Sequence, residues 1–290
     1  DSPSTITDSP STITDSPSTI TDSPSLTSQI IPTMDTYIEN LSKTHTVLAQ
    51  STPDFHLYLT NNDVNRINQG LSFNDGIRLE LNESNKESLI QDIMRKDKSV
   101  VIYPVFTSTA YKEPGFYTYF AGNCDQSCVT DLSFKNPEFQ YTSSGATAQI
   151  LYHAGYDFLT DIQVDKNPEL LQNYDTVILL HNEYVTQKQF DAISTHPNLI
   201  FLHPNALYAL VTVDYDTSSI TLIQGHDYPP ENPMKNGFNY EIEQRFHDYE
   251  YDSDCLDWEF IEIENGFHLN CYPETIIATN YDILKKMKDL

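Results

Sequence analysis

Six polar side chains able to do acid–base or metal chemistry follow three apolar segments of the chain. The segments are 176–180 (TVILL), 198–202 (NLIFL) and an apolar stretch that ends near residue 224. The side chains are His181, Glu183, Tyr184, His203, Asn205 and His226. Imidazole and carboxylate groups act as general acids and bases, and both bind metal ions. Each residue alone is equally typical of a helix cap or a loop, but their grouping at matching strand ends indicates one site.

The apolar segments alternate with helical patterns, which predicts a parallel sheet covered by helices on both faces. The runs at 99–106, 176–180 and 198–202 are continuously apolar, as in strands buried on both faces. Helices are expected at 86–96, at 143–154 and after a Thr186 cap. Because sites in such sheets lie beyond the carboxyl ends of the strands, we expect the polar cluster to gather there.

Outside this pattern, three regions lead to separate expectations. Residues 29–98 form a lead-in segment, with a helix at 34–50 and a strand at 55–60. The loop-rich stretch 107–142 is aromatic, and its rings form a binding platform if exposed or a cap on the sheet if buried. After Leu210, the segments VTVDYD and SITLIQG predict one hairpin, and 258–263 with 267–272 predict another around Asn265-Gly266.

The segment HNEYVT, followed by a helix, a strand and PNALYA, resembles a known family. It is similar to the glutamine-amidotransferase-like domain at the C-terminus of N,N-dimethylformamidase large subunits, and the resemblance covers roughly 145–210. The matching residues are His181, Glu183, Tyr184, Asn205 and Tyr208. The resemblance implies a flavodoxin-like fold over 99–290, with C-terminal β-hairpin additions. It also implies that Tyr184 is a metal ligand, because the amidase members bind iron through tyrosinates and a carboxylate.

The sequence departs from the family pattern at several positions. Both Gly-Gly turns are absent, with His196-Pro197 and His203-Pro204 near their places, and Val185 stands where the family has Trp. No motif locates a second tyrosine ligand. No G-x-C-x-G nucleophile elbow is present either, which argues against amidotransferase chemistry through a cysteine.

Two functions remain open on this sequence. The first is metal-assisted hydrolysis of an amide, in which a metal-activated water attacks and Glu183 or His181 is the general base. Tyr184, His203 and His226 would bind the metal, iron or zinc, and Asn205 would line the pocket. The second is a non-catalytic surface module that binds a glycan, a protein or a cation. The acidic run from Asp248 to Glu259 approaches a calcium-loop pattern, but it lacks the usual Gly and is equally typical of a solvated loop.

The four cysteines predict disulfides in an exported chain. We favour Cys124–Cys128, which closes the GNCDQSC loop, and Cys255–Cys271, which ties two late strands. A four-thiolate zinc site is the rival, but the C-x₃-C spacing and the isolated later pair differ from zinc knuckles.

Composition and repeats indicate an extracellular or cell-surface protein. The 290 residues carry a net charge of −26, which repels nucleic acid and anionic lipid. No stretch approaches the roughly 20 apolar residues of a membrane span. The unit DSPSTIT occurs three times in succession from Asp1, and its Ser, Thr and Pro content predicts that 1–28 is a disordered tether. Such a tether suits a cell-envelope anchor upstream of the chain.

Overall fold

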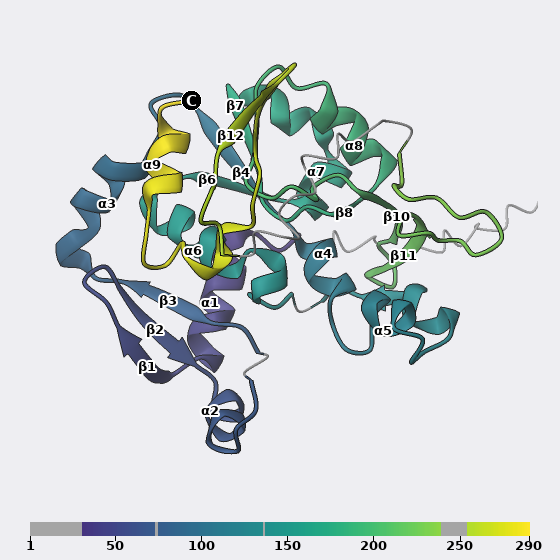
Figure 1. Ribbon diagram of the computed structural model, residues 1–290, viewed down its shortest axis with the longest axis horizontal. Helices are drawn as coiled ribbons and strands as arrows, with labels where there is room; N and C mark the ends of the chain where they lie inside the picture. Colours follow the sequence, from purple (N-terminus) through teal and green to yellow (C-terminus); the bar gives the residue numbers. More distant parts are fainter. Residues whose placement is uncertain (1–30, 73–74, 136, 239–253) are drawn as a thin grey trace, which may run out of the picture. The chain divides into compact units, whose positions relative to one another are not determined.

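The continuous apolar runs of the sequence form the centre of a six-stranded sheet. The computed structural model describes residues 31–290 apart from 73–74, 136 and 239–253 (Figure 1). The DSPSTIT repeats and the first half of the calcium-loop candidate therefore lie outside the described residues. The strands of this sheet are β12 (Phe260–Ile263), β13 (Gly266–Leu269), β9 (Leu199–Phe201), β7 (Thr176–Leu179), β4 (Ser99–Tyr103) and β6 (Asp157–Thr160), in spatial order.

The strand order confirms the predicted flavodoxin-like α/β fold. The strands from β13 to β6 are parallel, and β12 pairs antiparallel with β13. In chain order the parallel strands are β4, β6, β7, β9 and β13, so their spatial order is 2-1-3-4-5. The order reverses between β4 and β7. The chain passes from β4 to β6 at one edge of the sheet, and it then returns to form β7 on the other side of β4. Sheets of this type bind ligands at that reversal, beyond the carboxyl ends of the strands.

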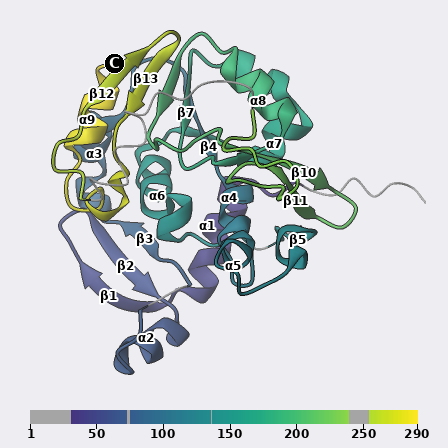
Figure 2. The same ribbon diagram turned by 45° about the vertical axis from the view of Figure 1, so that its right-hand side comes forward.

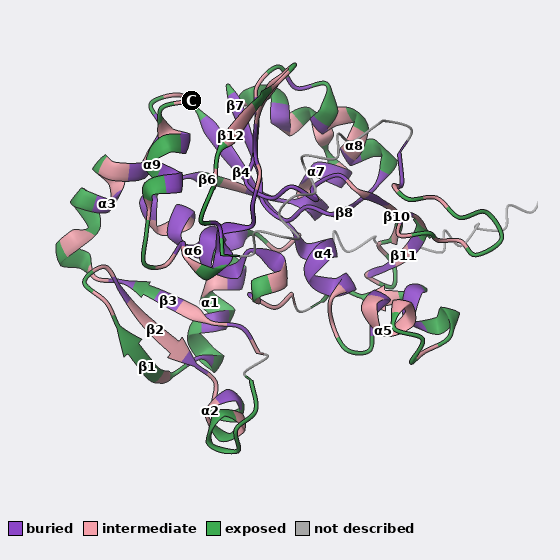
Figure 3. Cartoon of the chain, viewed as in Figure 1, coloured by how far each residue is buried: buried purple, intermediate pink, exposed green. Residues whose placement is uncertain are grey.

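Both faces of the central strands are buried, as their apolar runs predict (Figure 3). Along β4, Val101 and Tyr103 point into one core, while Val100 and Ile102 point into the other. Helices cover each face (Figure 2). The first core contains residues of α1 (Met34–Thr44), α3 (Lys86–Ile93), α6 (Gly145–Ala154) and α9 (Asp282–Lys288), and the second those of α7 (Asp161–Lys166), η4 (Pro168–Asn173) and α8 (Gln187–Ser194).

The predicted Thr186 cap of α8 is confirmed. Thr186 Oγ1 accepts a hydrogen bond from the Gln189 amide at 3.1 Å, and Gln189 Oε1 accepts one from the Thr186 amide at 2.7 Å. This reciprocal pair is a capping box, which satisfies two amides at the start of the helix. The cap fixes where the chain turns after the polar segment 181–184.

Two predicted elements are shorter than expected. The helix expected at 34–50 ends at Thr44, and β1 (Val47–Ser51) then pairs with β2 (Phe55–Leu59), which pairs with β3 (Arg78–Leu81). The chain turns between β1 and β2, where the Thr52 and Phe55 backbones are hydrogen-bonded at 2.8 Å. The strand expected at 99–106 ends at Tyr103, because Pro104 is followed by a helix, α4 (Val105–Ala110).

The predicted late hairpins both form, but one of them joins the main sheet. β10 (Ala209–Asp214) pairs with β11 (Ser219–Gln224) in a smaller sheet that includes β5 (Leu132–Ser133) and β8 (Tyr184–Val185). The β12–β13 hairpin extends the central sheet instead, because β13 lies parallel to β9. Gly266 permits this approach, since a Cβ there would overlap the Leu199 backbone.

The remaining described helices are short. They are α2 (Asn61–Asn68), α5 (Phe116–Phe120), η1 (Glu83–Asn85), η2 (Gln126–Val129), η3 (Tyr141–Ser143) and η6 (Pro273–Thr275). The stretch 107–142 is thus not a loop throughout, because α4, α5 and η2 lie within it. None of the helices described in 31–290 is long and apolar enough to cross a membrane.

Both predicted disulfides are confirmed. Cys124 bonds Cys128 at the start of η2, and Cys255 bonds Cys271 directly after β13. Both sulfurs of the second pair are buried. The second bridge therefore ties the end of β13 to the segment that leads into β12.

A buried arginine holds the C-terminal helix against the amino-terminal edge of the sheet. Arg95 donates to the Met287 carbonyl of α9 at 2.7 Å and to Asp97 at 2.8 Å. Thr176, the first residue of β7, also donates to Asp97, at 2.6 Å. These bonds, with that from Arg95 the strongest, hold the pKa of the Asp97 carboxyl well below its usual range.

Replacement of Arg95 should therefore destabilise the fold far more than replacement of an exposed cation. We expect Arg95→Met to lower the free energy of unfolding by about 3 kcal/mol, because Asp97 and the Met287 carbonyl lose their partner. Lys43→Met, which breaks an exposed pair with Glu39, should change it by less than about 1 kcal/mol. Urea unfolding followed by circular dichroism measures both. Equal losses in the two variants would contradict a structural role for Arg95.

Candidate active site at the carboxyl ends of β4, β7 and β9

A fully buried carboxylate, Glu183, lies at the centre of the polar cluster. Its side chain has 0% exposure. Its backbone amide donates to Thr107 Oγ1 of α4 at 3.0 Å, and its carbonyl accepts from the amides of Tyr208 and Ala209 at 3.0 and 2.9 Å. The segments that follow β4, β7 and β9 therefore all hold Glu183, as expected for the point where the strand order reverses.

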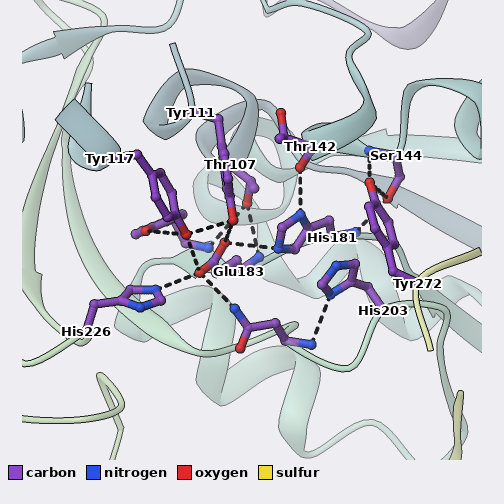
Figure 4. A network of polar contacts seen from close by, with 12 residues as sticks. Thr107, Tyr111, Tyr117, Thr142, Ser144, His181, Glu183, His203, His226 and Tyr272 are labelled. Carbon is purple, nitrogen blue, oxygen red and sulfur yellow. Dashed lines mark hydrogen bonds and ion pairs between the residues drawn. The ribbon is translucent and has the colours of Figure 1, made fainter. Parts of the chain in front are cut away.

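Five described side chains surround the two carboxylate oxygens (Figure 4). At Oε1, hydrogen bonds arrive from Asn205 Nδ2 at 2.8 Å, Tyr117 at 3.1 Å and His226 Nε2 at 2.6 Å. At Oε2, the Tyr111 hydroxyl donates at 2.9 Å and His181 Nε2 forms an ion-pair contact at 2.9 Å. This set gives the buried charge the partners that it requires.

The two tyrosines come from the stretch that follows β4. Tyr111 caps the end of α4, and Tyr117 lies in α5. The chain reverses between them through a cis peptide bond before Pro114, and their rings stack with centroids 4.1 Å apart. Their hydroxyls are 2.7 Å apart. Each hydroxyl also lies within hydrogen-bonding distance of a different oxygen of Glu183, so two phenolic and two carboxylate oxygens lie close together.

The orientation of His181 is fixed by the turn before α6. Its Nδ1 lies 2.6 Å from the Thr142 carbonyl, and its backbone amide donates to Ser144 Oγ at 3.1 Å. A carbonyl oxygen can only accept, so Nδ1 carries a proton. Nε2 is therefore the ring nitrogen that faces Glu183 and can gain or lose a proton.

His203, at the end of β9, lies behind His181. The two rings stack with centroids 3.6 Å apart and an interplanar angle of 12°. His203 Nδ1 accepts a hydrogen bond from the Asn205 amide at 3.0 Å, which leaves this nitrogen without a proton. Burial lowers the pKa of His203 well below its usual value, and His181 contributes in the same direction, so the ring is neutral.

His226 reaches Glu183 from the turn that directly follows β11, next to the start of β10. Gly225, His226 and Asp227 all have positive φ, and a Cβ on Gly225 would lie 2.8 Å from Ala209 Cβ. This turn therefore packs closely against β10 only with glycine at 225. The His226 side chain is 23% exposed, against 0% for Glu183. His226 is therefore more exposed than His181, whose side chain is 5% exposed.

The electrostatics of the cluster keep Glu183 charged and the tyrosines neutral. Burial alone would raise the pKa of Glu183, but His181 and His226 outweigh it and hold that pKa well below its usual range. Burial raises the pKa of Tyr111 and of Tyr117, and the nearby Glu183 charge raises both further. Without a bound cation, both phenols therefore remain protonated donors to the carboxylate.

The structure brings most of the sequence-predicted site residues together. His181, Asn205 and His226 contact Glu183 directly. Tyr184 lies one contact further out, since its hydroxyl is 3.4 Å from that of Tyr117, and His203 contacts His181. The roles predicted for these residues stay predictions.

Several residues of the cluster are not among the site residues that the sequence predicts, although four of them fall in the aromatic stretch 107–142. These are Thr107, Tyr111, Tyr117, Thr142, Ser144 and Tyr272. One available signal is that Tyr111 and Tyr117 follow the apolar run of β4, whose carboxyl end is where such sheets bind ligands. We found no comparable signal for the turn at 142–144.

A metal ion at this site would need other side chains as ligands in addition to His, Cys, Asp and Glu. In the described part of the chain, no group of three or more His, Cys, Asp and Glu side chains could hold a metal ion. The group formed by Tyr111, Tyr117 and Glu183 is a different donor set, because it includes two phenolic oxygens.

Fold and site together define an α/β protein with a buried Tyr–Glu–His cluster at the reversal point of a flavodoxin-like sheet. Residues 80–236 match the family described as N,N-dimethylformamidase beta subunit-like, C-terminal. This match covers more than half of the 290 residues, and the chain belongs to that family. A search of curated proteins gave no match. The matched range contains Glu183 and the five side chains around it.

A second buried carboxylate, Glu274 of η6, supports the turn that orients His181. Its oxygens accept hydrogen bonds from the Ala146 amide and from Thr147, whose hydroxyl lies 2.6 Å away. These are first-turn groups of α6, which otherwise lack partners within the helix. Burial raises the pKa of Glu274 to about 7, although these hydrogen bonds oppose the rise.

This raised pKa predicts that the contribution of Glu274 to stability falls between about pH 4.5 and pH 7. An unfolded Glu titrates near 4.3, so over this range the unfolded state releases a proton that folded Glu274 retains. We expect this group to lower the free energy of unfolding by roughly 3 kcal/mol from pH 4.5 to pH 8. Glu274→Gln should remove that decline, whereas Glu262→Gln on exposed β12 should not. Urea titrations across this range measure it, and an unchanged slope in Glu274→Gln would refute the assignment.

Proposed function

We propose that this domain is a metal-dependent amide hydrolase that acts outside the cell. The observation that carries the proposal is the close grouping of two phenolic oxygens with the carboxylate of Glu183. Tyr111 Oη and Tyr117 Oη lie 2.7 Å apart, Tyr111 Oη lies 2.9 Å from Oε2 of Glu183, and Tyr117 Oη lies 3.1 Å from Oε1. Adjacent ligands at right angles, with metal–oxygen bonds of about 2.0 Å, lie about 2.8 Å apart. The spacing of these oxygens is therefore close to that of neighbouring ligands on one metal ion.

The charge of this donor set favours ferric iron over zinc. Two tyrosinates and one carboxylate carry three negative charges, which a trivalent ion neutralises. A divalent ion would leave one net negative charge in a fully buried site, which is unfavourable. We therefore assign the ligand roles to Tyr111, Tyr117 and Glu183, and place Tyr184 beside the ligands rather than among them. When bound, such an ion supplies Lewis-acid polarisation of a carbonyl and lowers the pKa of water.

The other residues of the cluster orient Glu183 and move protons. Asn205 and His226 donate to Oε1, which fixes the plane of the carboxylate. His181 is the proposed general base, because its Nδ1 proton is committed to Thr142 and its Nε2 faces the reacting centre. Nε2 would accept the proton of the attacking water and return it to the departing amine nitrogen as the C–N bond breaks.

The family resemblance and the chain's other features support the remaining parts of the proposal. The family takes its name from an amidase, which supports a small amide as substrate. The two disulfides suit an oxidising compartment. The aromatic rings of the 107–142 stretch do not favour the rival binding module, because Phe116 is fully buried and Tyr111 and Tyr117 point toward Glu183.

Ferric iron added to purified metal-free protein should produce a visible absorption band from phenolate-to-iron charge transfer. Tyr111→Phe and Tyr117→Phe should each weaken and shift the band, and Glu183→Gln should abolish tight binding of the ion. Tyr184→Phe is the matched control, since Tyr184 is a buried tyrosine beside the proposed ligands but is not one of them. A band lost in Tyr184→Phe and kept in the other two tyrosine variants would reverse the assignment. Absence of any band in the wild type would rule out the metal site.

The iron-loaded protein should hydrolyse N,N-dimethylformamide or a similar small amide to a carboxylate and an amine. We expect His181→Gln to lower kcat by roughly 10²- to 10⁴-fold, because glutamine cannot accept and return a proton. The visible band should persist in this variant. His196→Gln, at a buried histidine that bonds backbone carbonyls near the opposite edge of the sheet, should retain activity. Amine release measured by chromatography tests this, and an unchanged kcat in His181→Gln would exclude His181 as the base.

A further inference from the structure

We infer that Tyr272 is a positioning residue for His181, and that it acts through two separate contacts. The inference rests on the proposed function, because it assigns His181 the role of general base. Tyr272 lies in the segment after β13, about 90 residues beyond His181 and outside the matched range 80–236. Its side chain is buried, with 5% exposure.

The first contact runs through the Tyr272 hydroxyl. This hydroxyl donates to the Tyr141 carbonyl and accepts from the Ser144 amide at 3.0 Å. It therefore bridges the two ends of the turn 141–144. The same turn presents the Thr142 carbonyl to His181 Nδ1 and the Ser144 hydroxyl to the His181 amide. One hydroxyl thus holds in place both groups that orient His181.

The second contact runs through the Tyr272 ring. The edge of this ring meets the His203 ring, with centroids 4.2 Å apart and an interplanar angle of 67°. His203 in turn stacks on His181, as Figure 4 shows. The three rings are therefore packed one against the next. Tyr272 limits the movement of the His203 ring, and His203 limits rotation of the His181 ring out of its plane.

The strained backbone of the turn explains why it needs this support. Ser144 has φ of 54°, in the left-handed region that a residue with a side chain rarely adopts. Such conformations persist where the surrounding structure holds them. Tyr272 and Glu274 hold this turn and the first residues of α6 from the same short segment. The Cys255–Cys271 disulfide anchors that segment directly before Tyr272.

These contacts determine which ring nitrogen of His181 faces Glu183. A rotation of the imidazole by half a turn would exchange the positions of its nitrogen and carbon atoms and remove Nε2 from Glu183. The hydrogen bond from Nδ1 to Thr142 opposes that rotation, and the stack opposes tilting. Loss of Tyr272 should therefore affect proton transfer by His181 while the Tyr111, Tyr117 and Glu183 oxygens keep their places.

The test measures the Nδ1 proton of His181 by NMR of metal-free protein with ¹⁵N-labelled histidine. In the wild type this proton should exchange slowly, because it bonds a buried carbonyl. His181→Gln assigns the signal. In Tyr272→Phe we expect this proton to exchange roughly tenfold faster. This factor corresponds to the loss of one net hydrogen bond from the 141–144 turn. In the iron-loaded protein the same variant should lower kcat with KM within twofold and the visible band unchanged.

Tyr156→Phe is the matched control. Tyr156 has the same 5% exposure, and its hydroxyl likewise donates to a carbonyl, that of Ile93, and accepts from an amide, that of Arg95. A general loss of stability would appear in both variants, whereas faster exchange at His181 should appear in Tyr272→Phe alone. Equal exchange rates in Tyr272→Phe and the wild type, or equal changes in both variants, would overturn the inference.

Substitutions at His203 keep the inference testable if Tyr272→Phe does not fold. His203→Phe retains a stacking ring and should keep exchange slow, whereas His203→Leu removes the stack and should accelerate it. Equal rates in these two variants would overturn the stacking part of the inference. The NMR readout needs no metal, so it stands even if ferric iron produces no band, which would reject the proposed function alone.

Discussion

The burial of the Glu183 charge is the constraint on which the rest of the site depends. A carboxylate removed from water is strongly destabilising unless hydrogen bonds and opposite charges replace its hydration. In this protein the replacements come from the segments after β4, β7 and β9 and from the turn after β11. No single segment could supply them. The fold must therefore bring these loops to one point before the charge can be accommodated.

The sheet topology provides that point. Where the order of parallel strands reverses, the connections from β4 and β7 lead away in opposite directions. The space between them is open to side chains from both, and α4 and the turn before α6 fill it. Thr107 and Ser144 bind the backbone of the 181–184 segment from opposite sides. The same hydrogen bonds that fix the loop also fix the direction in which His181 and Glu183 point.

Local patterns predicted much of this arrangement. The apolar runs predicted β7 and β9, and the polar residues directly after them predicted the position of the site. The Thr186 cap and both disulfides also followed from sequence. These features depend on neighbouring residues or on spacing along the chain, so their signals are contained in short segments.

The features that were not predicted depend on contacts between distant segments. Tyr111 and Tyr117 reach Glu183 because α4 begins directly after Pro104 and the chain reverses at Pro114, and neither event has a clear apolar pattern. The parallel pairing of β13 with β9 was missed as well, since a hairpin pattern predicts its own two strands but not its outer neighbour. The family resemblance predicted Tyr184 as a ligand because it is the tyrosine of the HNEYVT motif, although the hydroxyls nearest to Glu183 come from about 70 residues earlier.

The late position of β13 in the chain also bears on how the protein is made. The five side chains that contact Glu183 are all synthesised before residue 227. The segment that carries Tyr272 leaves the ribosome some 45 residues after His226. During synthesis, β9 therefore lacks its parallel neighbour β13 until late, and the 141–144 turn lacks the Tyr272 hydroxyl that bridges it. The order of translation makes the support of His181 one of the last steps in folding.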